Sequence, residues 1–266
     1  TMGYALYHPE IKKIMYWPDF TAFRDWYGYL SISLPATVML CAEMWAIEVL
    51  LLIAGTMSVE DLAAQTIVAS VCGTLSMIPL GIQEATCALV GNCMGADNVP
   101  LAKMLFRMVT KFTLAIIAVI FLFMFFGRKF IAQAYTDDEA VVLLVVQCFN
   151  ILAFAQMFQT MQSFLQGPIR GMGIQNKASY LALACYYILG IPLALLFGVK
   201  VGMGVVGLQV GIFAAAIFLV VSYLSLLLKT DWQRVADHAV ERIHRAANID
   251  QQRDLSQIED DYKSQQ

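Results

Sequence analysis

The sequence predicts an all-α integral membrane protein with six transmembrane helices. Of its 266 residues, 59% are hydrophobic and only 14% are charged, whereas soluble domains carry about a quarter charged residues. The mean hydropathy is +0.67. Apolar segments recur along the chain, each close to the ~20 residues that a helix needs to cross a hydrocarbon core of ~30 Å. Open strands would leave backbone groups unpaired in lipid, so these segments are expected to be helices.

The apolar segments divide the chain into three parts. Residues 1–28 form an N-terminal segment, 29–228 the membrane part and 229–266 a polar tail. Short polar connectors separate the six spans, which are predicted at 29–54, 62–83, 105–126, 140–163, 178–198 and 204–228. The chain begins with Thr1 and has no signal peptide at its start, so we expect it to be an excerpt of a longer protein.

The distribution of basic residues predicts the orientation. An even number of spans places both ends on one side of the membrane. On that side lie Lys12, Lys13, Arg24, Lys103, Arg107, Lys111, Arg170, Lys177, Lys229 and Arg234. The other side has only Arg128, Lys129 and Lys200. The positive-inside rule therefore makes the N-terminal segment and the tail cytoplasmic. The sequence leaves open whether the membrane is the plasma membrane or that of a vacuole-type organelle.

The tail begins with a helical pattern. Apolar residues recur at helical spacing from Trp232 to Ala247, and Thr230 with Gln233 predicts a capping box. Such an amphipathic helix either lies on the inner membrane face or is solvated in the cytoplasm, and both interpretations stay open. The rest of the tail is polar and is expected to be disordered.

Several spans contain residues that weaken a helix. Hinges are predicted at Pro35, Pro79, Gly81, Gly190 and Pro192. Bendable helices are common in transporters, which open to each side of the membrane in turn. Single breakers are also tolerated in ordinary membrane helices. In the last span, a pair of glycines four residues apart predicts close helix packing at Gly207 and Gly211.

Two carboxylates interrupt the first span, in the stretch MLCAEMWAIEVLL. A charged acid at a helix centre costs about 2.5–3.5 kcal/mol on insertion scales, so Glu43 is expected to face the bundle interior. Glu48 lies ~7.5 Å further along the axis and is turned by ~140°, which argues against a paired metal site. We predict that both acids bind a proton or a cation. The alternative is a hydrogen-bonded structural role.

Other classes of site find little support. There is no hydrolase, nucleotide-binding or zinc-protease motif, no catalytic residue is predicted, and the three histidines lie outside the spans. The cysteines form no CxxC pair, so no metal is expected. No basic tract indicates nucleic acid. Glutamines in the fourth span either line a wet cavity or join helices, and they are Gln156, Gln159, Gln162 and Gln166.

Four motifs resemble the multidrug and toxin extrusion (MATE) family of transporters, in its eukaryotic form. They are SLPATVMLCAEMWAIEVLLLIAG (33–55), IPLGIQEATCALVGNCMGADN (78–98), LQGPIRGMGIQNK (165–177) and YYILGIP (186–192). They follow the order and spacing of the C-terminal half of the family, over roughly residues 30–228. The resemblance implies that this chain is the second of two six-helix lobes and that residues 1–28 link it to a missing N-terminal lobe. A half that dimerises is the alternative.

The resemblance also implies a function and a site. The expected function is export of organic cations or related amphiphiles in exchange for H⁺ or Na⁺, with the two lobes rocking in the lipid bilayer. No cofactor is implied beyond the coupling ion. Glu43 and Glu48 match the family's acids of this helix. Trp45, Tyr186 and Tyr187 match its cavity-side aromatic residues.

The chain departs from the family pattern at two cavity positions. Ser70 and Gln159 stand where animal members have acids. Gln159 is still expected to line the cavity. The loss of two acids argues against a preference for strongly cationic substrates. The main alternative function is a flippase for lipid-linked precursors, which would favour basic residues in the cavity. A lipid-modifying enzyme would need a clustered His or Asp site near one membrane face.

Overall fold

The computed structural model describes residues 26–241, and these are predominantly helical. The elements are α3 (Trp26–Ala54), α4 (Val59–Gly95), α5 (Val99–Tyr135), α6 (Glu139–Gly171), α7 (Gln175–Leu183), η2 (Ala184–Gly190), α8 (Ile191–Leu195), η3 (Leu196–Lys200) and α9 (Gly204–Lys229). A further helix covers 232–241. Among residues 26–241, six stretches are long and apolar enough to cross a membrane, with α7 to η3 counted as one. The prediction of six spans is confirmed.

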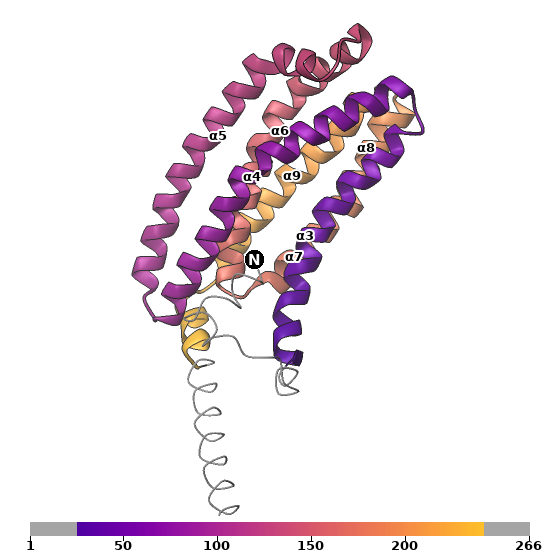
Figure 1. Ribbon diagram of the computed structural model, residues 1–266. Coiled ribbons are helices and arrows are strands. Elements are labelled where there is room, and N and C mark those ends of the chain that lie inside the picture. Colours follow the sequence, from indigo (N-terminus) through magenta and orange to yellow (C-terminus); the bar gives the residue numbers. More distant parts are fainter. Residues whose placement is uncertain (1–25, 242–266) are drawn as a thin grey trace, which may run out of the picture. The chain divides into compact units, whose positions relative to one another are not determined.

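The chain divides into two compact units, residues 1–34 and 35–266. In the first unit, the described part is the start of α3, where the Ser33 hydroxyl donates to the Tyr29 carbonyl at 2.8 Å. In the second unit, α6 packs against α4, α5 and α9, and α8 packs against α9. Figure 1 shows α4, α6 and α9 between α5 on one edge and α8 on the other. The predicted N-terminal segment, 1–28, lies almost wholly outside the described residues.

The helices are longer than the predicted spans, and the predicted connectors are correspondingly too long. The predicted spans 62–83 and 105–126 leave residues 84–104 between them, yet α4 continues to Gly95 and α5 begins at Val99. The segments 127–139 and 166–177 are also mostly helical. Hydropathy detects only the part of a helix that is apolar enough for lipid. The ends of the helices are instead determined by capping groups.

Capping side chains begin three of the helices. Asn98 accepts from the Leu101 amide at 3.1 Å, and Asp138 accepts from the Ala140 amide at 2.9 Å. At the start of α4, the Ser58 side chain accepts from the Asp61 amide at 3.0 Å and its hydroxyl donates to the Asp61 carboxylate at 2.9 Å. The three contacts to backbone amides each satisfy an N–H group that has no partner within its helix.

The same aspartate joins α4 to α9. The other carboxylate oxygen of Asp61 accepts from the Val205 amide at 3.1 Å, in the first turn of α9. Gly204 precedes it with φ of +61°, and a Cβ there would lie 3.0 Å from this oxygen. Only glycine therefore allows this backbone conformation and this close approach of the carboxylate. One side chain thus fixes the starts of two helices.

Glycines bring α9 against the segment that contains α8. A Cβ on Gly207 would lie 2.5 Å from the carbonyl carbon of Phe197, and a Cβ on Gly211 would lie 2.5 Å from the amide nitrogen of Ala194. Both distances are far below a van der Waals contact, so the two backbones touch because no side chain separates them. We call this contact of Gly207 and Gly211 with residues 190–198 the glycine seam. The predicted close packing is confirmed.

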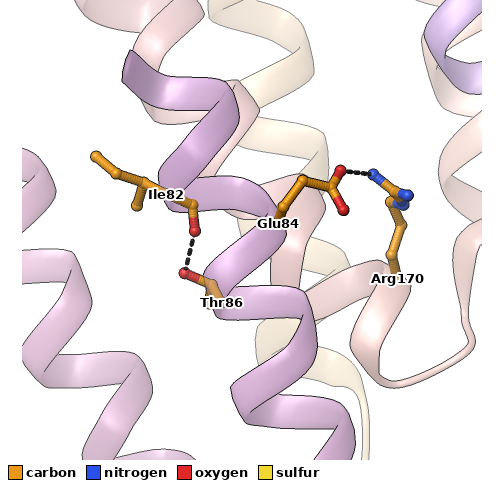
Figure 2. A network of polar contacts seen from close by, with 4 residues as sticks. All are labelled: Ile82, Glu84, Thr86 and Arg170. Atoms are coloured by element: carbon orange, nitrogen blue, oxygen red, sulfur yellow. Dashed lines mark hydrogen bonds and ion pairs between the residues drawn. The ribbon is translucent and has the colours of Figure 1, made fainter. Parts of the chain in front are cut away.

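A second close contact joins α4 and α6. A Cβ on Gly167 would lie 2.6 Å from the carbonyl oxygen of Gln83, and one on Gly171 would lie 2.6 Å from that of Cys87. Beside these glycines, the Arg170 guanidinium donates to the Glu84 carboxylate at 2.5 Å, and Figure 2 shows this ion pair reaching from α6 to α4. The packing is therefore accompanied by an ion pair at the rim of the contact.

The predicted hinge residues lie in two different settings. Helix α4 continues without interruption through Pro79 and Gly81, and Pro35 lies inside α3. The span from Gln175 to Lys200 instead contains two π-helical stretches. They flank the short helix that holds Pro192, and Gly190 is the last residue of the first stretch. A π-helical turn inserts an extra residue, so it changes the direction in which later side chains point. The hinge roles stay predictions.

The short helix at 232–241 is anchored to the bundle. Trp232 is only 8% exposed, its indole N–H donates to the Leu227 carbonyl at 3.2 Å, and its ring contacts Phe106 edge-on. The predicted capping box of Thr230 and Gln233 is wrong. Asp231 caps this helix instead, because its carboxylate accepts from the Gln233 amide at 3.1 Å. The rest of the predicted tail lies outside the described residues.

Candidate functional site

A cavity of about 340 Å³ opens among α3, α4, α6 and α9. Most of its wall is apolar, with Val68 and Leu152 from one hydrophobic cluster and Leu50 and Ile212 from the other. It therefore lies where the two cores of the bundle meet. Its polar lining consists of Glu43, Glu48, Gln65, Ser76, Gln83, Gln159, Ser163, Gln166 and Gln209.

Glu43 is held in this cavity by amide groups from α6. The Gln162 amide nitrogen donates to the Glu43 carboxylate at 3.0 Å, and Gln166 is a further hydrogen-bond partner. The Tyr186 hydroxyl in turn donates to the Gln162 amide oxygen at 3.1 Å. Tyr186 is fully buried, so it fixes the orientation of the amide that contacts Glu43. Three helical segments thus position a single carboxylate.

Glu48 lines the same cavity but lies on a different side of α3. The lining residues of this helix cover a wide arc, and the ~140° between the two acids places them near its opposite edges. The sequence correctly separated the acids around the helix. However, it did not indicate that one cavity would be wide enough to contact both. Glu48 is exposed, whereas Glu43 is partly buried.

A pair of glutamines that the sequence analysis did not single out closes one wall. The Gln209 amide nitrogen donates to the Gln65 amide oxygen at 2.6 Å, between α9 and α4, and both side chains are buried. Nearby, Gln83 is 2% exposed and its amide nitrogen contacts no acceptor among the described residues. Single glutamines inside apolar spans were the available signal, but only those of the fourth span were noted.

The other predicted site residues lie in varied places. Gln159 is among the residues that line the cavity, and its contact with a substrate stays a prediction. Tyr186 acts through Gln162, and Tyr187 is half-buried outside the described lining. Trp45 is 62% exposed and is also absent from that lining. Ser70 points back to its own helix, where its hydroxyl donates to the Thr66 carbonyl at 2.9 Å.

The charges of the lining define what the cavity can bind. Within the described lining, the only carboxylates are those of Glu43 and Glu48, and there is no lysine or arginine. Within the described residues, His, Cys, Asp and Glu side chains form no group of three that could hold a metal ion. Amide and hydroxyl groups beside the acids can orient a polar or cationic guest while the apolar wall contacts its hydrocarbon part. Membrane-length helices around such a cavity are typical of a membrane transporter.

Comparison with known proteins identifies the family. The family model described as MatE matches residues 35–196. Protein DETOXIFICATION 22 of Arabidopsis thaliana is 32% identical over 96% of this chain and 54% of its own length. Multidrug and toxin extrusion protein 1 of Oryctolagus cuniculus is 30% identical over 83% of this chain and 39% of its own length. The chain thus spans about half the length of the curated relatives it matches.

Solved structures share the fold. The crystal structure of the eukaryotic MATE transporter AtDTX14 superposes with a TM-score of 0.84 at 24% identity, over 91% of this chain and 55% of the other. A transporter of the MOP superfamily from Pyrococcus furiosus gives 0.69 at 17% identity, over 74% and 44%. The class of the protein is therefore a multi-pass integral membrane protein. The chain belongs to the MATE family, whose members are transporters rather than enzymes.

Proposed function

We propose that this chain forms the second six-helix lobe of an antiporter that exports organic cations or amphiphilic xenobiotics. The observation that carries the proposal is Glu43, a carboxylate in a largely apolar cavity, with its hydrogen bonds to Gln162 and Gln166. The resemblance of residues 33–55 to the seventh helix of the family supports the assignment to the second lobe. The names of the curated relatives support the extrusion of drugs and toxins.

The mechanism follows from competition for one acid. In the inward-facing state, ionised Glu43 attracts a cationic substrate into the cavity, and the apolar wall contacts its hydrocarbon part. In the outward-facing state, H⁺ or Na⁺ neutralises the carboxylate, so the substrate loses its counter-charge and leaves. Exchange is coupled because substrate and ion cannot occupy Glu43 together. Glu48, at the exposed edge of the cavity, attracts cations toward the inner acid.

A flippase for lipid-linked precursors is the second candidate function. Such substrates carry phosphate groups, which arginine and lysine bind. The described lining of the cavity has two acids and no such base. The charge of the cavity therefore favours a cation over a phosphorylated lipid.

The test is transport by the full-length protein reconstituted in vesicles. Efflux of a fluorescent organic cation is measured under an imposed pH gradient, and then under a Na⁺ gradient. We expect gradient-driven transport to fall at least 10-fold in Glu43→Gln. The matched control is Glu60→Gln, because Glu60 is an exposed glutamate in the first turn of α4, outside the cavity lining.

The outcomes separate the candidates. Transport that persists in Glu43→Gln would contradict the coupling role. Transport that is driven only by a Na⁺ gradient would identify Na⁺ as the coupling ion. If neither gradient drives cation transport, and the protein instead translocates a phosphorylated lipid, the flippase replaces the antiporter.

A further inference from the structure

A second cavity, of about 560 Å³, lies at the end of the bundle where α7, α9 and the helix 232–241 meet. It shares no residue with the lining of the Glu43 cavity. Its rim is basic: Lys177 comes from α7, Lys229 from the end of α9 and Arg234 from the short helix. We call it the basic groove. Three separate helical segments therefore each place one basic side chain at the rim of the basic groove.

These three basic side chains are available for a ligand. All three are exposed, and in the part of the chain that the structure describes none of them takes part in an ion pair. Asp231 also lines the groove, but its carboxylate accepts from the backbone amides of Gln233 and Arg234. His238 lies in the groove as well, 3.8 Å from the Glu241 carboxylate. The three cations outnumber the one lining carboxylate.

The groove continues from its basic rim toward the membrane. Ser225 and Ser222 line it one and two turns before Lys229, so the lining extends ~10 Å along α9. Leu226 lies beside Ser225 on α9, and Leu181 lies one turn after Lys177 on α7. The groove thus has cations at its rim, and both hydroxyl and apolar groups beneath them. A phospholipid offers matching groups, with its phosphate at the surface and its glycerol esters and acyl chains below.

The groove lies where two candidate membrane spans end, because one begins at Gln175 and another ends at Lys229. Its rim is therefore expected near the lipid headgroups. A smaller neighbouring cavity shares Thr230 and Asp231 with the groove and is lined by Lys103 and Arg107. Basic residues thus lie on both sides of the start of the short helix. This is the end of the bundle that the positive-inside rule places in the cytoplasm.

We propose that the basic groove binds the phosphate headgroup of an anionic phospholipid, with Lys177, Lys229 and Arg234 as its cationic partners. Ser222 and Ser225 contact the glycerol ester region, and the acyl chains follow the apolar walls. Basic pockets between transmembrane helices are suited to this role, because each cation near an anionic membrane surface strengthens binding about fivefold. The bound lipid fastens the short helix to α7 and α9.

The test measures lipid binding to the full-length protein in mild detergent by native mass spectrometry. Dioleoyl phosphatidylglycerol is compared with dioleoyl phosphatidylcholine, and inorganic phosphate is added as a soluble competitor. We expect the wild type to prefer phosphatidylglycerol. The double variant Lys177→Gln/Lys229→Gln is expected to bind it about 25-fold more weakly. The matched control is Lys129→Gln/Lys200→Gln, which removes two exposed lysines at the opposite end of the bundle.

A third variant separates a built groove from general surface charge. Ser222→Leu leaves every charge in place but fills the groove, and we expect it to lose most of the preference for phosphatidylglycerol. Equal binding of both lipids by the wild type would overturn the proposal, as would an equal loss in the control. Unchanged binding in Ser222→Leu would do so too. Displacement of the lipid by millimolar inorganic phosphate would assign the groove to a soluble anion instead.

Discussion

Helix α9 meets its neighbours in two opposite ways. Toward residues 190–198, Gly207 and Gly211 bring the backbones into contact. Toward α4, Gln209 reaches Gln65 across the wall of the Glu43 cavity. At the two glycines, no side chain lies between the backbones. The contact between the glutamines is polar and borders a cavity, so its hydrogen bond can be exchanged for one to a bound molecule. One helix therefore combines a fixed face with an adaptable one.

The largest effect is expected at the glycine seam. Gly211→Val places a branched side chain where even a Cβ would lie 2.5 Å from backbone atoms, so α8 and α9 must separate. We expect a loss of about 3 kcal/mol or more, the upper range of overpacking penalties. The measurement is the thermal unfolding midpoint of the purified protein.

Gly73→Ala is the control for this substitution, because a Cβ on Gly73 would meet nothing within 4 Å. Alanine there is expected to stabilise α4 slightly, by about 0.5–1 kcal/mol, through its better helix propensity. An unfolding midpoint for Gly211→Val at the wild-type value would show that the seam is adaptable after all, and the contrast between the two faces would disappear.

The glutamine pair gives the next largest effect. Gln65→Leu leaves the buried amide of Gln209 without its partner, and we expect a cost of about 1–3 kcal/mol. The double variant Gln65→Leu/Gln209→Leu removes both polar groups and is expected to be more stable than the sum of the single variants predicts. A double-mutant cycle on unfolding midpoints measures this coupling. Strict additivity would mean that the two amides do not act as a pair.

A smaller effect is expected at the start of α9. Asp61→Ala removes the acceptor of the Ser58 hydroxyl and the contact with the Val205 amide, while the Ser58 side chain still caps α4. In a Ser58→Ala background the bond between the two side chains is already absent, so Asp61→Ala removes only the contact with Val205. We expect a further loss of about 1 kcal/mol there, the typical contribution of one hydrogen bond. Thermal unfolding of the single and double variants measures it, and no further loss would show that the link between α4 and α9 adds no stability.

The smallest effect is expected at the ion pair between Glu84 and Arg170. The Glu84 side chain is 53% exposed, and exposed ion pairs contribute about 0–1 kcal/mol. Arg170→Gln should therefore lower stability by less than about 1 kcal/mol, measured by the unfolding midpoint at low and high salt. A larger loss would indicate that the pair, rather than Gly167 and Gly171, holds α4 against α6.

The sequence predicted most of the fold because its signals are strong and local. Six apolar segments determined the number of helices, and the spacing of Gly207 and Gly211 predicted their close packing. The helix ends could not be predicted from hydropathy, since α4 and α5 continue with polar residues beyond the lipid-crossing part. The cap at Asp231 was missed because Thr230 and Gln233 also satisfy a capping pattern. Only the backbone geometry shows that Asp231, and not Thr230, caps the short helix.

The candidate site was predicted in part for a similar reason. A carboxylate in an apolar span is conspicuous, so Glu43 and Glu48 were found from the residues alone. Gln162 was noted as part of a stripe, but its contact with Glu43 joins residues 119 positions apart. The pairing of Gln65 with Gln209 spans 144 positions. Such contacts depend on how the helices pack, which a single sequence does not specify.

The lengths of α4 and α5 have a mechanical consequence. Each has 37 residues and is therefore ~55 Å long, whereas the hydrocarbon core is ~30 Å thick. Only residues 96–98 separate the two helices, so they form one long hairpin whose helices extend beyond the hydrocarbon core. A tilt of ~10° about the midpoint of such a helix moves its end by ~5 Å, from the same helix geometry. A small rotation of α4 or α5 beside the cavity thus produces a large displacement of the helix ends at the membrane surface. A spectroscopic probe attached there can measure this displacement.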